Sequence, residues 1–213
     1  MKYEKTFYQK VNTVADWIIR IIMLNILMII TSLAIITIYP SLAAGYKLFH
    51  QYINKDEEKL FKGYFQYFIE DFGKKISISL VLILVLVLGY LNVTYYVDYL
   101  NAGANWFYMI GYYITLAFLV SCFIITLYTL TVMYVVPKAK MILMFKLAFY
   151  LSGKFFVKTV LLVFTTLIPF LMLMTPITQL VFVFGGLSIP VLLNALITNK
   201  VVIYIEGLVK EDV

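Results

Sequence analysis

The chain has 213 residues, of which 63% are apolar and only 13% charged, and its formal net charge is +6. A water-soluble domain carries about 25% charged residues, so this composition argues against a soluble globule and for a membrane protein. The single cysteine, Cys122, cannot form an internal disulfide. The single histidine, His50, argues against a zinc site built from the usual nitrogen and sulfur ligands.

Long apolar segments dominate the chain, and each is close to or longer than the roughly 20 helical residues that cross a bilayer. We therefore predict an all-α fold, a polytopic transmembrane helical bundle that forms a single transmembrane domain over residues 1–213. About five membrane helices are expected, at residues 17–39, 76–96, 106–136, 157–175 and 176–198. Amphipathic connectors are expected at residues 40–75 and 137–156, on the cytoplasmic side.

The first apolar segment carries two unusual polar residues. Arg20 lies near its start and can extend its guanidinium to the membrane surface. Asn25 lies deeper, where its amide is expected to find a partner on another helix. Small residues at Ser41-Leu42-Ala43 have signal-cleavage spacing, but the apolar run exceeds the 7–15 residues of a signal peptide. We therefore expect a retained span.

The connector over residues 40–75 contains a helical repeat of aromatic residues. The spacing i, i+3, i+4, i+7 predicts a helix with one aromatic face. Asn54 is expected to cap its start, with Glu57 three residues on. The face either packs on its own bundle at the membrane surface or docks a partner subunit. Its members are Phe61, Tyr64, Phe65, Phe68 and Phe72.

The second connector is basic. Four lysines are expected within about one third of the circumference of a helix that runs into the fourth span. Anionic lipid headgroups or a partner would contact these lysines. They are Lys140, Lys146, Lys154 and Lys158. No basic domain projects into water, so nucleic-acid binding is not expected.

Prolines and further polar residues occur in or next to the apolar segments. Pro40 and Pro137 are expected to end or kink helices, and Pro169 and Pro190 to kink spans. Gln179 and Asn194, like Arg20 and Asn25, are candidate intramembrane polar residues. Their expected role is to hold helices together, and the alternative is to line a polar path.

Lysine placement orients the chain, because cytoplasmic flanks of spans are enriched in Lys and Arg. Five crossings with a cytoplasmic carboxyl terminus place thirteen of the seventeen basic residues inside. The four left outside are Lys2, Lys5, Lys10 and Arg20. A cytoplasmic amino terminus would instead require the first segment to re-enter rather than cross.

The sequence offers no recognisable catalytic motif. No phosphate-binding loop, nucleophile elbow or paired carboxylate site is present, and no span interior contains Asp or Glu. We expect a protein that is not an enzyme and has no cofactor. The lack of intramembrane carboxylates also weakens an ion-coupled carrier.

Two strings resemble the YesL-like family of bacterial integral membrane proteins. They are Arg20-Ile21-Ile22-Met23-Leu24-Asn25 and Tyr39-Pro40-Ser41-Leu42-Ala43-Ala44, followed by the aromatic connector 61–72 and by Tyr134-Val135-Val136-Pro137. Ser41-Leu42 departs from the Ala-Thr usual in that family. The resemblance implies a protein of the bacterial cell membrane whose gene often lies beside carbohydrate ABC importers.

This resemblance leads to the expected function, a non-catalytic accessory subunit that packs on or regulates the permease or ATPase subunits of such an importer. The aromatic connector and Lys140, Lys146 and Lys154 would dock the partner. One alternative is an independent small-solute carrier or channel with a path lined by Asn25, Gln179 and Asn194. Another is an assembly or scaffold factor. The transported solute is not specified by the sequence.

Overall fold

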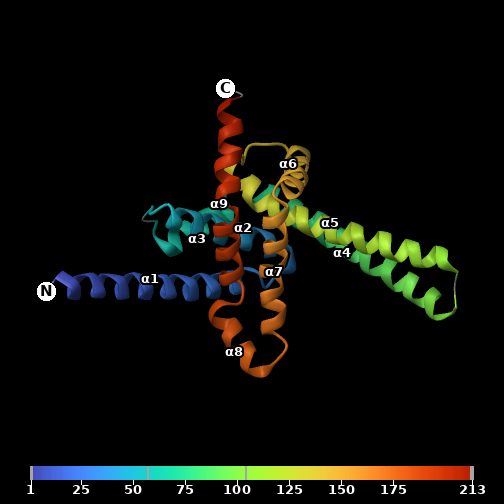
Figure 1. Cartoon of the computed structure of the whole chain (residues 1–213), viewed down its shortest axis with the longest axis horizontal. Helices are drawn as coiled ribbons and strands as arrows, with labels where there is room; N and C mark the ends of the chain where they lie inside the picture. Colours follow the sequence, from blue (N-terminus) through green and yellow to red (C-terminus); the bar gives the residue numbers. More distant parts are fainter. Residues whose placement is uncertain (1, 57, 104, 212–213) are drawn as a thin grey trace. The chain divides into compact units, whose positions relative to one another are not determined.

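The computed structural model describes residues 2–56, 58–103 and 105–211, with side chains between Val11 and Lys210. The predicted capping residue Glu57 and the side chains of Lys2, Lys5 and Lys10 lie outside the described part. In chain order the elements are α1 (Lys2–Thr31), η1 (Ile35–Thr37), α2 (Ile38–Ile53), α3 (Leu60–Ile69), α4 (Phe72–Asn101), α5 (Trp106–Val135), α6 (Met141–Lys154), α7 (Phe156–Met172), α8 (Pro176–Gly185) and α9 (Ser188–Glu211) (Figure 1).

The described elements are helices, which confirms the all-α prediction. Among the described residues, four helices are long and apolar enough to cross a membrane, and the bent pair α6 and α7 adds a possible fifth. The four windows are Val11–Thr31, Phe72–Asn101, Trp106–Val135 and Ser188–Lys210. The chain is a multi-pass membrane protein.

Two of the predicted spans have different bounds. The helix expected over 17–39 ends at Thr31, and α2 begins at Ile38, so Pro40 lies in the first turn of α2 and does not end a helix. Proline is tolerated there because first-turn N–H groups have no partner within the helix. The span expected over 176–198 is broken between Gly185 and Ser188, which leaves Pro190 in the first turn of α9.

The connectors also differ from the prediction. The aromatic helix ends at Ile69, and Asp71 has a φ of 50°, a left-handed conformation that interrupts the helix before Phe72. Asn54 follows the last residue of α2, so it ends that helix instead of capping the next one. The basic connector and fourth span do not form one helix, because α6 and α7 meet at 105°.

The chain divides into two compact units where the sequence predicts a single domain. The first contains residues 1–70 and 161–197, and the second residues 71–160 and 198–213. Two of the dividing points fall inside the continuous helices α7 and α9.

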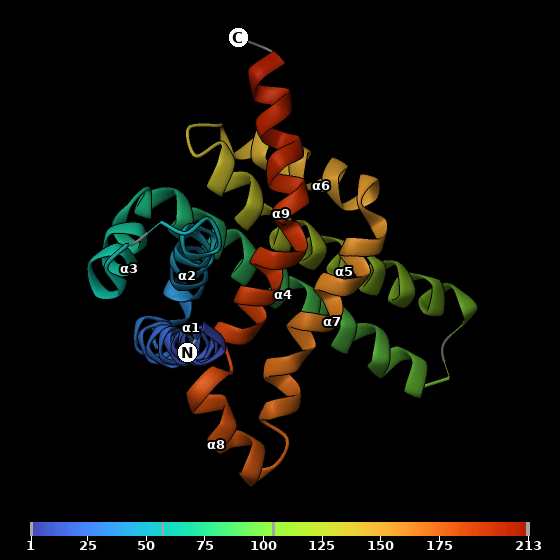
Figure 2. The same cartoon turned by 60° about the vertical axis from the view of Figure 1, so that its left-hand side comes forward.

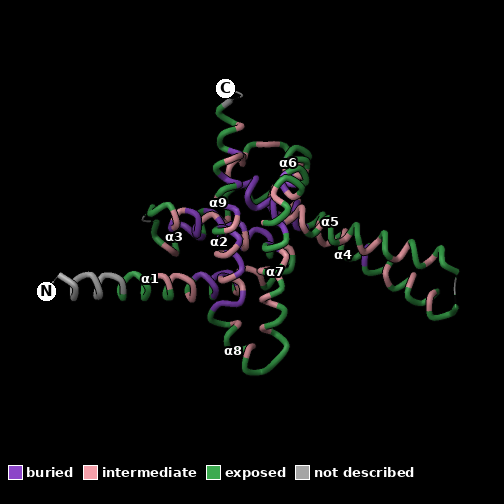
Figure 3. Tube along the Cα trace, in the orientation of Figure 1, coloured by how far each residue is buried: buried purple, intermediate pink, exposed green. Residues whose placement is uncertain are grey.

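The first unit is built around α2. Eleven of its 16 residues are buried, and Figure 3 shows burial concentrated in α2 and the carboxyl-terminal part of α1. Helices α1 and α3 pack on α2, and α8 packs on α1. In Figure 2, α1 is viewed end-on with α2 beside it.

The second unit contains the long hairpin of α4 and α5, visible in Figure 1. Lys74 Nζ, near the start of α4, donates to the carbonyls of Pro137 and Ala139 in the turn after α5. Tyr128 on α5 lies 2.9 Å, hydroxyl to hydroxyl, from Thr159 on α7. These polar contacts tie the hairpin to the helices that follow it.

Candidate interaction surface and polar clusters

Helix α3 presents an apolar edge that is exposed among the described residues. Phe61, Phe65 and Ile69 are 57%, 46% and 67% exposed, and at 100° per residue they follow one edge of the helix. Gly63, Tyr64 and Tyr67 occupy the buried side. The predicted aromatic face is therefore divided: Tyr64 packs inward, Phe68 is half-buried, and Phe72 belongs to the next helix.

Tyr64 anchors α3 through a buried cluster of hydroxyl groups. Its oxygen lies 2.6 Å from Thr31 Oγ1 and 2.9 Å from Ser41 Oγ, and Ser41 Oγ donates to the Met28 carbonyl at 3.0 Å. Burial raises the pKa of Tyr64 although the hydrogen bonds to Ser41 and Thr31 lower it, so the phenol stays neutral. Three helices, α1, α2 and α3, are joined at this cluster.

Sequence reasoning missed this cluster. Thr31 and Ser41 are small hydroxyl residues inside apolar stretches, and no spacing rule connects them to Tyr64. One available signal was Ser41 itself, where the chain departs from the family that it resembles.

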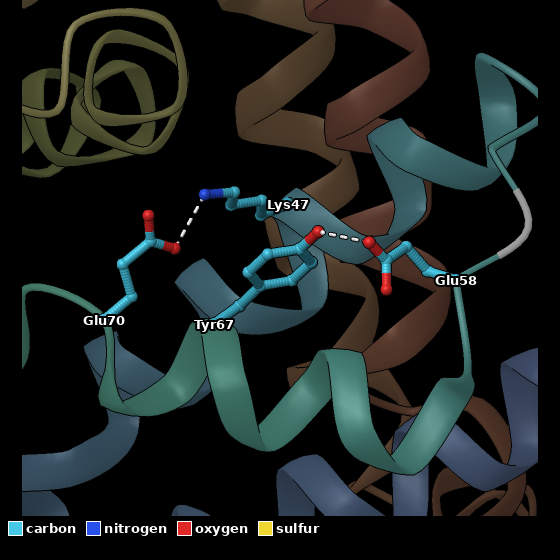
Figure 4. A network of polar contacts seen from close by, with 4 residues as sticks. All are labelled: Lys47, Glu58, Tyr67 and Glu70. Atoms are coloured by element: carbon cyan, nitrogen blue, oxygen red, sulfur yellow. Dashed lines mark hydrogen bonds and ion pairs between the residues drawn. The ribbon is translucent and has the colours of Figure 1, made fainter.

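A charged network joins α3 to α2 on another side (Figure 4). Lys47 Nζ lies 2.6 Å from Glu70 Oε2 and 4.5 Å from the centre of the Tyr67 ring. The Tyr67 hydroxyl donates to Glu58 Oε1 at 3.4 Å. Since the ion pair is partly exposed, its stabilisation is about 1 kcal/mol or less, and its main effect is to fix the orientation of α3 on α2.

Arg20 takes part in an aromatic contact. Its guanidinium carbon lies 4.2 Å from the centre of the Tyr52 ring, and Trp17 meets the same ring edge-on at 6.5 Å. A cation over an aromatic face contributes about 0.5–2 kcal/mol. The predicted polar residue Arg20 thus links α1 to the far end of α2.

Asn25 forms the most complete polar site among the described residues. Its Nδ2 donates to the carbonyls of Phe182 and Val183 at 2.9 and 2.7 Å. Its Oδ1 accepts from the backbone N–H groups of Leu187 and Ser188 at 2.8 and 3.0 Å. The side chain is fully buried. The partner expected on another helix is the backbone on either side of the break between α8 and α9.

The geometry explains why the predicted last span is broken. In a continuous helix the Leu187 N–H would donate to the Val183 carbonyl. Here the Asn25 amide lies between those two groups and bonds to both. Gly186 leaves room for the Phe182 ring, which an added Cβ would overlap. The asparagine thus takes the place of a helical hydrogen bond.

Gln179 and Asn194 do not share the Asn25 contacts. Gln179 is exposed, and its Nε2 donates to the Leu173 carbonyl at 3.0 Å, just after α7 ends. Asn194 is buried in α9. Gln179 thus bonds to backbone six residues earlier in the chain, whereas Asn25 bonds to backbone 157 to 163 residues away.

The predicted basic face is not a single surface. Lys140 precedes α6, Lys146 and Lys154 lie on it, and all three are exposed. The bend at Phe155 puts Lys158 on another helix, so the four lysines do not share one face. Lys154 Nζ lies 3.7 Å from the centre of the Tyr204 ring on α9, which leaves Lys140 and Lys146 as the candidates for a partner or headgroups.

His50 is buried in α2, and its ring centre lies 4.7 Å from that of Tyr46.

Comparison with known protein families gives one match. Residues 21–93 match the model of a family described as "Protein of unknown function, DUF624". This segment is about a third of the chain, and it contains Asn25, the hydroxyl cluster and all of α3. Neither the curated proteins nor the solved structures that were searched contain a match.

Proposed function

We propose that this protein is a non-catalytic accessory subunit of a bacterial carbohydrate ABC importer, a member of the YesL-like family that lies in the cell membrane with a cytoplasmic carboxyl terminus. The observation that carries the proposal is the exposed edge of α3, formed by Phe61, Phe65 and Ile69. Exposed aromatic and aliphatic side chains on a fixed helix are typical of surfaces that bind a partner.

Rigidity of α3 supports this role. Tyr64 is bonded to two other helices on the buried side, and Lys47 pairs with Glu70 at the carboxyl end. A surface held in this way loses little conformational entropy when it binds. Lys140 and Lys146 on α6 would add a second, electrostatic contact with the permease or ATPase.

The segment matched by the family model, residues 21–93, contains α3 together with the residues that hold it. An independent carrier or channel has less support. It needs Asn25, Gln179 and Asn194 along one path, whereas the Asn25 amide already bonds to four backbone groups.

Co-purification tests the proposal. The protein, tagged at its carboxyl terminus, is isolated in mild detergent from the membranes of its own bacterium, and retained subunits are identified by mass spectrometry. We expect a permease and an ATPase of a carbohydrate importer. Phe65→Glu should reduce their yield at least tenfold, because it places a charge in the apolar contact.

The matched control is Gln66→Glu, which introduces the same side chain at the next, exposed polar position of α3. It should leave the yield unchanged. If the wild-type protein retains neither subunit, the accessory role is wrong. Importer abundance that then falls on deletion of the gene would indicate an assembly factor, and solute flux in liposomes with this protein alone would indicate a carrier.

A further inference from the structure

Helix α2 runs back along α1. At one end, Ser41 Oγ donates to the Met28 carbonyl, and the Gly45 backbone packs close to the Met28 side chain. At the other end, the Tyr52 ring meets Arg20 and Trp17. Residues later in α2 thus contact residues earlier in α1, which is the pairing of an antiparallel hairpin, as Figures 1 and 2 show.

The two arms have the same length. Eleven residues separate Ser41 from Tyr52, and eleven separate Met28 from Trp17, which corresponds to about 16 Å of helix in each arm. Because Val11–Thr31 is long and apolar enough to cross a membrane, α2 returns through most of the depth that α1 crosses.

The turn between α1 and α2 has a composition compatible with the membrane face opposite to the amino terminus. Residues 32–37 contain no charged side chain, and Leu33 and Ile35 are 79% and 69% exposed. Helix α2 is less apolar than a usual span, but its polar Ser41 and His50 are fully buried. Protein covers most of α2, and its charged Lys47, which is 26% exposed, is paired with Glu70.

We infer that α1 and α2 form a membrane hairpin, so that the amino terminus and the turn after Asn54 lie on the same face of the membrane. This inference does not depend on the proposed function. It replaces the single crossing predicted for the first segment with two crossings.

The hairpin explains why the amino-terminal segment carries positive charge. A single crossing leaves Lys2, Lys5, Lys10 and Arg20 on the face opposite to the other thirteen basic residues. With two crossings, the amino-terminal lysines join Lys55, Lys59 and Lys62. The amino-terminal lysines then lie on the same face as the basic connectors, as the charge rule for bacterial membrane proteins favours.

Cysteine accessibility tests the hairpin. Cys122 is the only cysteine, so Cys122→Ala provides a background for single cysteines at Asn12, Asn54 and Ala102. All three native side chains are exposed. Intact cells are treated with a membrane-impermeant maleimide, and labelling is compared with that after the membrane is opened.

We expect Asn12→Cys and Asn54→Cys to label only after opening, and Ala102→Cys to label at once, since α4 separates it from Asn54. Labelling of all three after detergent solubilisation controls for folding and reactivity. If Asn12→Cys and Asn54→Cys label from opposite faces, α1 crosses alone and the hairpin is wrong.

Discussion

At the scale of single residues, a few buried polar side chains determine how apolar helices meet. The helices of this protein have few polar atoms, and lipid offers no hydrogen bonds in exchange. A hydrogen bond to a buried polar group must therefore come from the protein itself. Asn25 and Tyr64 do so by bonding to more than one element at once.

Asn25→Ala should destabilise the protein by about 2–4 kcal/mol, since four hydrogen bonds are lost and averages for single bonds in membrane proteins are roughly 0.6 to 1 kcal/mol. Thermal unfolding in detergent measures this change. Asn92→Ala is the control, because the Asn92 amide is exposed and donates to the Leu88 carbonyl of its own helix. Equal effects of the two substitutions would contradict the role given to Asn25.

At the scale of elements, composition predicts where apolar helices occur better than where they end. The span predicted over 106–136 agrees with α5, because its ends are marked by Asn105 and Pro137. The break after Thr31 lies in residues as apolar as those around it. It is stabilised by Thr37, whose hydroxyl donates to the carbonyls of Thr31 and Ala34.

The break in the last predicted span depends on Asn25, which is far away in sequence, so no local pattern could reveal it. For α3, the period of the aromatic residues indicates a helix correctly. Which side is buried depends on hydroxyl partners in α1 and α2, which a single segment does not contain.

Close approach of α4 and α5 depends on Gly89. A Cβ at this position would overlap the Leu119 side chain on α5. Gly89→Leu should therefore cost about 1–3 kcal/mol, the usual penalty for overpacking, seen as a lower unfolding temperature. Gly73→Ala, in the same helix, has no atom within 4 Å of the new Cβ and should leave stability unchanged or slightly raised. A tolerated leucine at 89 would indicate a looser hairpin.

At the scale of the whole molecule, the sequence predicts the class of protein because the bilayer imposes strict requirements on length and polarity. Several helices satisfy them. The division into two units was not predictable, because it depends on contacts between residues 1–70 and 161–197, at opposite ends of the chain.

The bonds of Asn25 also bear on the order in which the protein is made. Asn25 enters the membrane with the first helix, yet its backbone partners at residues 182–188 are synthesised more than 150 residues later. Until then its amide has none of its final partners. The first unit therefore reaches its final structure only when synthesis is nearly complete. In a chain truncated before α8, the Asn25 amide would lack its backbone partners, which distinguishes an incomplete chain from a finished one.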